Sequence, residues 1–142
     1  MFNVRQISDD LYYVGGNDRR LELFENVYPI PDGVSYNSYL LVDDKTVLLD
    51  TADAAIAHQF LENVEHVLDG KPLDYVVVNH MEPDHCATLC DIVVHYPDVK
   101  IVGNTMTFRM MKQFFDFDVD KHAIVVKAGD TLETGHHVLN FV

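Results

Sequence analysis

The sequence has few cysteines, few basic residues and no long hydrophobic run. Its two cysteines, Cys86 and Cys90, lie four residues apart, which is a poor disulfide framework and fits a reducing cytoplasm. Ten Lys and Arg stand against 23 Asp and Glu, and the net charge of −13 argues against nucleic acid and anionic membranes as partners. No apolar stretch approaches the roughly 20 residues of a transmembrane helix, and no signal-peptide segment opens the chain. We therefore expect an acidic cytoplasmic protein.

The 142 residues, 48% of them hydrophobic, are enough for one domain with a packed core. Short apolar runs alternate with amphipathic segments, which predicts an α/β fold. Strands are expected at Leu11–Gly15, Tyr36–Val42, Thr46–Asp50, Asp74–Asn79, Val99–Gly103, Ala123–Val126 and Val138–Val142, with turns at Asp130–Thr131 and Thr134–Gly135. Helices are expected over Ala54–Leu68, around Cys86–His95, and from Thr105 with Met106, Met110 and Phe114 recurring on one apolar face. The stretch Asp18–Gly33 is expected to be a loop.

The most informative segment is Asn79-His-Met-Glu-Pro-Asp-His85, which directly follows a valine-rich strand. It holds four potential metal ligands in six positions, His80, Glu82, Asp84 and His85. Sites in α/β folds gather at the carboxyl ends of strands. If the loop is extended, alternate residues share one side, so His80, Glu82 and Asp84 would converge while His85 faces a second centre. Imidazole and carboxylate ligands without thiolate suit iron, manganese or zinc and argue against a structural zinc site.

Two other interpretations of this part of the chain remain open. The segment could be a polar loop in which Asp84 caps the next helix, although four ligand types in six residues favour metal binding. Asp50 and Asp53 could orient a metal-bound histidine, but Asp53 could equally cap the helix that follows it.

The pattern His80-x-Glu82-x-Asp84-His85 resembles the metal motif of flavodiiron proteins, or A-type flavoproteins. Further likeness lies in Gly16–Arg19, Leu23–Asn26, Pro29-x-Pro31-x-Gly33, Ser35–Leu40 and Lys127–Thr131. The resemblance implies that residues 1–142 are the N-terminal half of a metallo-β-lactamase-like αββα fold. It also implies that His80 and Glu82 bind one iron and that Asp84 and His85 bind the other.

The same resemblance implies an oxidoreductase that reduces dioxygen or nitric oxide, with electrons from FMN in a flavodoxin-like domain or from rubredoxin. That FMN domain, and the further His, Asp and His ligands expected downstream, are not among these residues. We therefore expect an incomplete site, no catalytic residue assigned within the chain, and a sheet face that a second copy could cover in a homodimer. A dinuclear metallo-hydrolase and a non-catalytic metal-binding or dimerising half-domain are the alternatives.

Most other candidate residues have simpler explanations. His136 and His137 could be considered as further metal ligands, but neighbours on a strand point to opposite faces, so at most one could face the site. They are expected to be solvent-facing turn residues after Gly135. The cysteines and the Met110–Met111 and Phe114–Phe115 pairs are interpreted as packing residues, and the remaining histidines as structural or surface groups.

Overall fold

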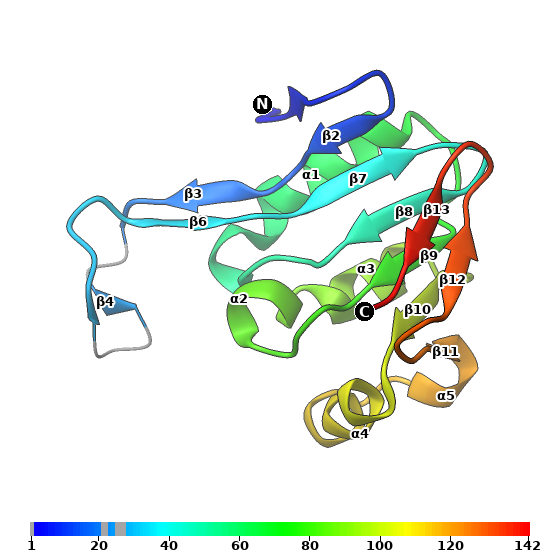
Figure 1. Cartoon of the computed structure of the whole chain (residues 1–142). Helices are drawn as coiled ribbons and strands as arrows, with labels where there is room; N and C mark the ends of the chain where they lie inside the picture. Colours follow the sequence, from blue (N-terminus) through cyan, green and yellow to red (C-terminus); the bar gives the residue numbers. More distant parts are fainter. Residues whose placement is uncertain (1, 21–22, 25–27) are drawn as a thin grey trace.

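The computed structural model describes residues 2–20, 23–24 and 28–142, and the side chains of residues 2–20 and 28–142. In the described part, a mixed sheet of seven strands forms the centre of the molecule, in the order β1-β2-β7-β8-β9-β10-β11 (Figure 1). These strands span Arg5–Gln6, Leu11–Tyr13, Tyr39–Val42, Thr46–Leu49, Tyr75–Val77, Lys100–Gly103 and Ala123–Val125, respectively. β1, β2, β7 and β8 pair antiparallel, whereas β8, β9, β10 and β11 pair parallel.

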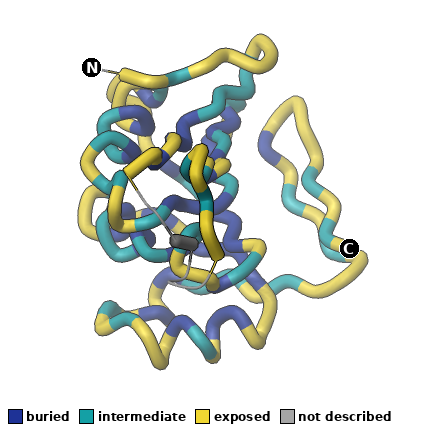
Figure 2. The backbone as a smooth tube through the Cα atoms, turned by 90° about the vertical axis from the view of Figure 1, so that its left-hand side faces the viewer, coloured by how far each residue is buried: buried dark blue, intermediate teal, exposed yellow. Residues whose placement is uncertain are grey.

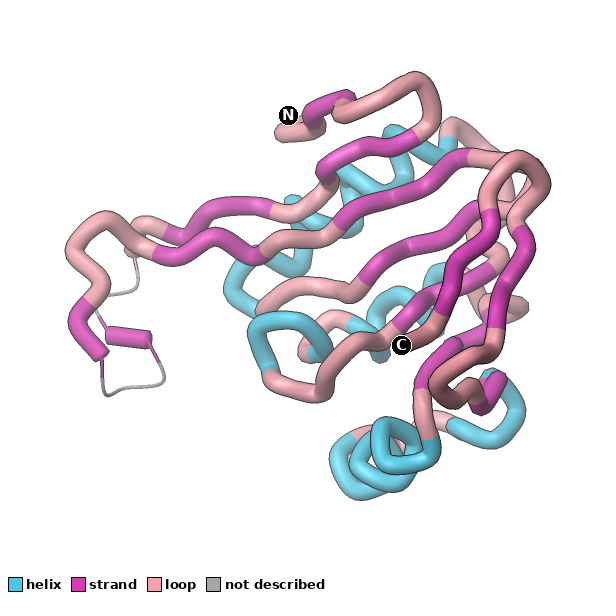
Figure 3. Tube along the Cα trace, viewed as in Figure 1, coloured by secondary structure: helices cyan, strands magenta, loops and turns pink. Residues whose placement is uncertain are grey.

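The first face of the sheet carries the larger core. Helices α1 (Ala57–Leu68) and α3 (Leu89–His95) lie behind the sheet in Figure 3. Phe60 and Val64 of α1 and Ile92 of α3 are completely buried in one cluster with Leu40, Leu48, Val76 and Ile101 of the strands. The predicted helical face from Ile56 to Val67 is confirmed, because its apolar side chains all join this cluster. The helix begins as a 3-10 turn, η1 (Ala54–Ile56), capped by Asp53, and α1 ends at the left-handed Asp69.

A two-stranded ribbon lies on the other face of the sheet (Figure 1). It pairs β12 (Thr131–Glu133) with β13 (Val138–Asn140). Leu132, Leu139 and Phe141 pack against a second, smaller cluster that includes Val77 and Val102. The predicted turn at residues 130–131 is thus wrong in part, since Thr131 begins a strand. In the described residues, one helix layer covers one face of the sheet and the ribbon lies on the other, which agrees with half of the expected αββα sandwich.

The predicted loop at Asp18–Gly33 contains more pairing than expected. β3 (Gly16–Asp18) pairs with β6 (Val34–Tyr36), and β4 (Leu23–Phe24) pairs with β5 (Tyr28–Pro29). The two pairs form an arm that extends away from the main sheet (Figure 1). Part of this loop, and part of the motif at residues 23–26, lies outside the described residues.

Two helical predictions need correction. The helix expected around residues 86–95 is split into α2 (Pro83–Cys86) and α3, because Thr88 turns its hydrogen bonds toward the chain at Ala52. Helix α4 (Thr105–Phe114) buries Thr107, Phe108 and Met111. Of the predicted apolar face, Met106 and Phe114 are 58% and 68% exposed, whereas Met110 is partly buried against the main cluster. α4 and the short α5 (Val119–His122) lie at the β10–β11 end of the sheet, where only one side of α4 meets the core (Figure 1). No helix in the described residues is both long and apolar enough to cross a bilayer.

Candidate metal centre

The candidate site begins where strand β9 ends. The backbone N–H of Val78 still donates to Val102 of β10 at 2.9 Å, and the chain then leaves the sheet at Asn79. Pro83 opens helix α2 at one of its first two positions, where its fixed φ and missing N–H are tolerated. Asp84 and His85 consequently lie in a helical turn and not in an extended loop.

This turn decides which predicted ligands meet. His80, Asp84 and His85 each offer one ligand atom, and these three atoms lie within 4.8 Å of one another. The His80 and His85 rings are 4.6 Å apart between centroids. Glu82 lies outside this group and is 65% exposed, with Oε2 at 4.0 Å from Nδ1 of His80. Of the three alternate residues expected to converge, His80 and Asp84 do so, but His85 joins them in place of Glu82, because the backbone becomes helical after Glu82.

The arrangement also brings the four residues together in two adjacent pairs. Besides the His80–Glu82 approach, His85 Nε2 lies 3.5 Å from Oδ2 of Asp84. Asp84 and His85 are mostly buried, with side-chain exposures of 18% and 19%, whereas His80 is 42% exposed. One pair thus faces the protein interior more than the other.

The first anchor of this segment is Asp50, immediately after strand β8. Its Oδ1 accepts from the backbone N–H of Asn79 at 2.7 Å, and its Oδ2 accepts from the Asn79 side-chain amide at 2.9 Å. Asp50 adopts a left-handed backbone conformation, with φ of 58°. The Ser38 hydroxyl donates to its carbonyl oxygen at 2.8 Å. Asp50 therefore orients the residue before His80, and no hydrogen bond from Asp50 to a histidine is found among the described residues.

The second anchor joins the same chain segment to helix α2. Thr51 donates both its backbone N–H and its hydroxyl to the carbonyl oxygen of His85, each at 2.9 Å. Beside this contact, the Ala52 N–H donates to the Thr88 hydroxyl, and that hydroxyl donates to the Ala52 carbonyl, each at 3.0 Å. Thr51, Ala52 and Thr88 are fully buried. Thr51 and Thr88 were not among the predicted site residues, and the only sequence signal for them is a small polar residue beside an apolar run.

The chemistry of these residues fits a bound cation. Within the described residues, Nδ1 of His85 is the only buried side-chain nitrogen or oxygen without a hydrogen-bond partner. Such a group is costly unless a ligand satisfies it. The negative charge of Asp84 is also felt by its neighbours. Burial, with the charges of Asp53, Asp18 and Asp84, raises the pKa of Tyr36 to about 12. Burial, with Asp84 and Asp50, raises the pKa of the Cys86 thiol to about 11.

Several other predicted residues lie in structural roles. Asp53 caps η1 through the Ala55 N–H, so the capping interpretation holds. His122 is buried and its Nδ1 contacts the carbonyl of Val99 at 2.7 Å. Cys86 donates to the Met81 carbonyl at 3.0 Å, and both cysteines are free. Phe114 is not core; it lines a groove with Met81, Pro83, Cys86, Ala87 and Phe115.

Comparison with known proteins places this geometry in context. The chain is 33% identical over 138 residues to a flavo-diiron protein from Clostridium acetobutylicum, covering 96% of this chain and 34% of that protein. It is 31% identical over 137 residues to a nitric oxide reductase from Moorella thermoacetica, with coverages of 96% and 34%. It thus spans about a third of the length of these relatives.

Solved structures and a family match agree with the sequence relatives. A flavo di-iron protein mutant from Thermotoga maritima has a TM-score of 0.90 at 30% identity, covering 100% of this chain and 36% of that chain. Rubredoxin oxygen:oxidoreductase from Desulfovibrio gigas has a TM-score of 0.85 at 29% identity, covering 97% and 34%. Residues 34–142 match the family described as ODP family beta lactamase. The chain therefore belongs to the ODP family beta lactamases and has flavodiiron proteins as its relatives.

Proposed function

We propose that this chain holds iron in the dinuclear centre of a flavodiiron-type oxidoreductase that reduces dioxygen or nitric oxide. The observation that carries the proposal is the grouping of His80, Asp84 and His85 on a turn that two buried anchors fix to the sheet. The relatives support the proposal, because they include a flavo-diiron protein, a nitric oxide reductase and a rubredoxin oxygen:oxidoreductase.

The two adjacent pairs give each residue a role. His80 and Glu82 would bind one iron, and Asp84 and His85 would bind the second. The two carboxylates offset the charge of the cations, and the two imidazoles contribute nitrogen ligands that suit iron. Bound iron supplies the one-electron chemistry of the reduction. Asp50 and Thr51 position the ligands by holding Asn79 and the His85 carbonyl, so the ligands lose little freedom on binding.

The remaining parts of the activity are assigned outside these residues. Further metal ligands and an FMN-bearing flavodoxin-like domain are expected from the family resemblance, and the chain spans about a third of its relatives. We therefore propose that residues 1–142 alone bind metal without turnover. Electrons would come from the flavin domain or from a rubredoxin-type donor, in a cytoplasmic homodimer.

Elemental analysis tests the metal assignment. The protein is purified without oxygen or added metal, and iron, zinc and manganese are measured per folded chain. We expect iron in the unmodified chain and its loss in Asp84→Ala and His85→Ala. Asp98→Ala is the matched control, because Asp98 is an exposed acidic residue outside the site. Circular dichroism establishes that each variant is folded.

The outcomes separate the proposed function from its alternatives. Iron that stays bound in the folded Asp84→Ala and His85→Ala variants would place the metal elsewhere. Zinc in place of iron would favour the dinuclear hydrolase. Glu82→His provides a further check, because replacing a hard carboxylate by imidazole is expected to move metal preference from iron toward zinc.

A further inference from the structure

The β12–β13 ribbon is held on the sheet mainly at its turn. Thr134 is the only buried residue between residues 131 and 142. Leu132, Leu139 and Phe141 are only partly buried against the second cluster. Figure 2 shows the ribbon as a largely exposed hairpin beside the main body. Its attachment therefore depends strongly on the polar contacts around Thr134.

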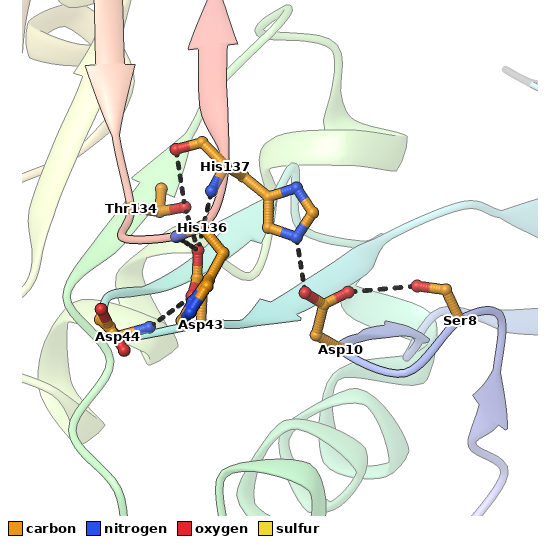
Figure 4. Close-up of polar contacts among 7 residues, drawn as sticks. All are labelled: Ser8, Asp10, Asp43, Asp44, Thr134, His136 and His137. Carbon is orange, nitrogen blue, oxygen red and sulfur yellow. Dashed lines mark hydrogen bonds and ion pairs between the residues drawn. The ribbon is translucent and has the colours of Figure 1, made fainter.

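Asp43, in the turn between β7 and β8, makes most of these contacts (Figure 4). Its Oδ2 accepts from the Thr134 hydroxyl at 2.8 Å and from the backbone N–H groups of His136 and His137 at 2.7 and 3.1 Å. Its Oδ1 lies 2.8 Å from Nδ1 of His136. The Asp43 side chain is 2% exposed. A nearly buried carboxylate thus accepts the hydrogen bonds that hold the ribbon turn.

Two further contacts complete the attachment. His137 Nε2 pairs with Oδ2 of Asp10, which lies in the turn between β1 and β2 (Figure 4). The backbone N–H of Lys45 donates to the Thr134 carbonyl at 2.8 Å. The ribbon turn is therefore clamped to two separate turns of the main sheet.

The charges around His136 favour its protonated form. Asp43 and Asp44 act on it from the β7–β8 turn and Asp10 from the β1–β2 turn, while the basic residues Lys45 and His137 are next in sequence to Asp44 and His136. The hydrogen bond to Asp43 and the nearby carboxylates raise the pKa of His136 above its usual 6.5. Burial alone would raise the pKa of Asp43, but the hydrogen bonds from His136, Thr134 and the backbone lower it well below its usual range.

Asp43, Asp44 and His136 resemble a metal site, but the Asp43 carboxylate is already engaged in hydrogen bonds. Asp43, Asp44 and His136 offer ligand atoms within 4.8 Å of one another. Both Asp43 oxygens, however, already accept hydrogen bonds from the ribbon turn. The observed contacts are hydrogen bonds that join the ribbon turn to the β7–β8 turn.

We propose that His136, His137, Asp43 and Asp10 form a pH-dependent latch that fastens the β12–β13 ribbon to the sheet. Protonated His136 closes the latch, and loss of its proton weakens it, so the ribbon opens more often as pH rises above the histidine range. The far end of the ribbon lies beside the end of strand β9, which leads to the site. Phe141 and Val142 line a small pocket with Val77, Val78 and Asn79, the residues leading to His80. The latch is independent of the proposed metal function.

Hydrogen exchange on the whole chain tests the latch. Protection factors, corrected for the intrinsic pH dependence of exchange, are measured from about pH 5.5 to about pH 8.5. We expect ribbon amides in residues 131–140 to lose protection severalfold across this range, relative to amides of β7 and β8. In His136→Gln, protection is expected to be low at all pH values and nearly independent of pH. His95→Gln, which alters an exposed histidine on α3, should behave as the unmodified chain.

A second readout keeps the test decisive. The His136 imidazole is titrated by NMR, and its pKa is expected above 6.5 in the unmodified chain and lower in Asp43→Asn. His136 is 79% exposed, so its substitution leaves no buried cavity. Ribbon protection that does not change with pH, or that keeps the same pH dependence in His136→Gln, would overturn the proposal. A His136 pKa at or below 6.5 would overturn it as well.

Discussion

Asp50 holds Asn79 with both oxygens of its carboxylate, one on the backbone N–H and one on the side-chain amide. The two residues follow the ends of the neighbouring parallel strands β8 and β9, so this contact fixes where the metal-binding turn starts. It spans 29 residues of sequence. The geometry of His80 is therefore set by a strand that contributes none of the proposed ligands.

Asp50→Ala is expected to destabilise the protein by about 1–3 kcal/mol, because Asn79 would lose both of its hydrogen bonds to the charged Asp50 carboxylate. Metal affinity should also fall, since the turn is no longer oriented. Denaturant unfolding and metal titration measure the two effects. Asp53→Ala, which removes only a helix cap, is the comparison and should leave metal affinity unchanged. Equal affinity in Asp50→Ala and the unmodified chain would contradict the anchoring role.

Thr88→Val is expected to cost more stability than Thr51→Val. The Thr88 hydroxyl accepts from the buried Ala52 N–H, so its loss leaves a donor unsatisfied at a cost of about 1–3 kcal/mol. The Thr51 hydroxyl only donates to the His85 carbonyl, which keeps the Thr51 N–H as a donor, so its loss should cost about 1 kcal/mol. Denaturant unfolding of both variants measures the order, and the reverse order would contradict this account.

Met111→Ala and Met106→Ala distinguish the observed face of α4 from the one expected from sequence. Met111 is completely buried, and its truncation is expected to cost about 2–5 kcal/mol. Met106 is 58% exposed, and its truncation should change stability by no more than about 0.5 kcal/mol. Thermal unfolding of the two variants is the measurement. Equal losses would show that both faces of α4 are packed.

The two cysteines should differ in reactivity. Cys86 is 5% exposed and burial raises its pKa to about 11, so the reactive thiolate is scarce at neutral pH. Brief treatment with iodoacetamide should modify Cys90 first, as read by peptide mass spectrometry. Because the unfolded thiol ionises near 9.0, the unfolded state loses its proton first and stability should fall as pH rises above that value. Cys86→Ala should reduce this alkaline loss.

The latch should also weaken at low pH, where its carboxylates become protonated. The hydrogen bond from His137 lowers the pKa of Asp10 from the usual 3.8. Burial alone would raise the pKa of Asp43, but its hydrogen bonds from His136, Thr134 and the backbone lower it below 3.8. A lowered carboxyl pKa stabilises the fold above pH 3.8, and this stabilisation is lost as pH falls through the folded-state value. Asp43→Asn should flatten the acid limb of a thermal-unfolding profile. An unchanged limb would contradict the role of Asp43.

The parts of the fold predicted from sequence are those with one clear periodicity. Ile56, Phe60, Val64 and Val67 share a single helical face, and the structure buries it. Helix α4 instead carries apolar residues on two sides, and only its place at the sheet edge decides which side meets the core. Pattern alone does not contain that placement.

The candidate site was predicted to a similar extent. Its four residues could be named because they are close in sequence, but the helical turn that begins at Pro83 and sets their geometry was expected to be an extended loop. Thr51 and Thr88 were missed because their partners lie 34 and 36 residues away. The roles of His136 and His137 depend on partners 93 and 127 residues away, so a turn position was the most that sequence could indicate.

The contact between Asp10 and His137 also bears on how the chain folds. It joins residues 127 positions apart, so forming it closes almost the whole chain into a loop. Contacts of such long separation carry a large loop-closure cost, and the β7–β8 hairpin and helix α1 have local contacts that need not wait for it. The ribbon turn should therefore join the structure after the folding transition state. Substitutions there would speed unfolding and leave the folding rate nearly unchanged, so the latch governs how long the folded protein lasts and not how quickly it forms.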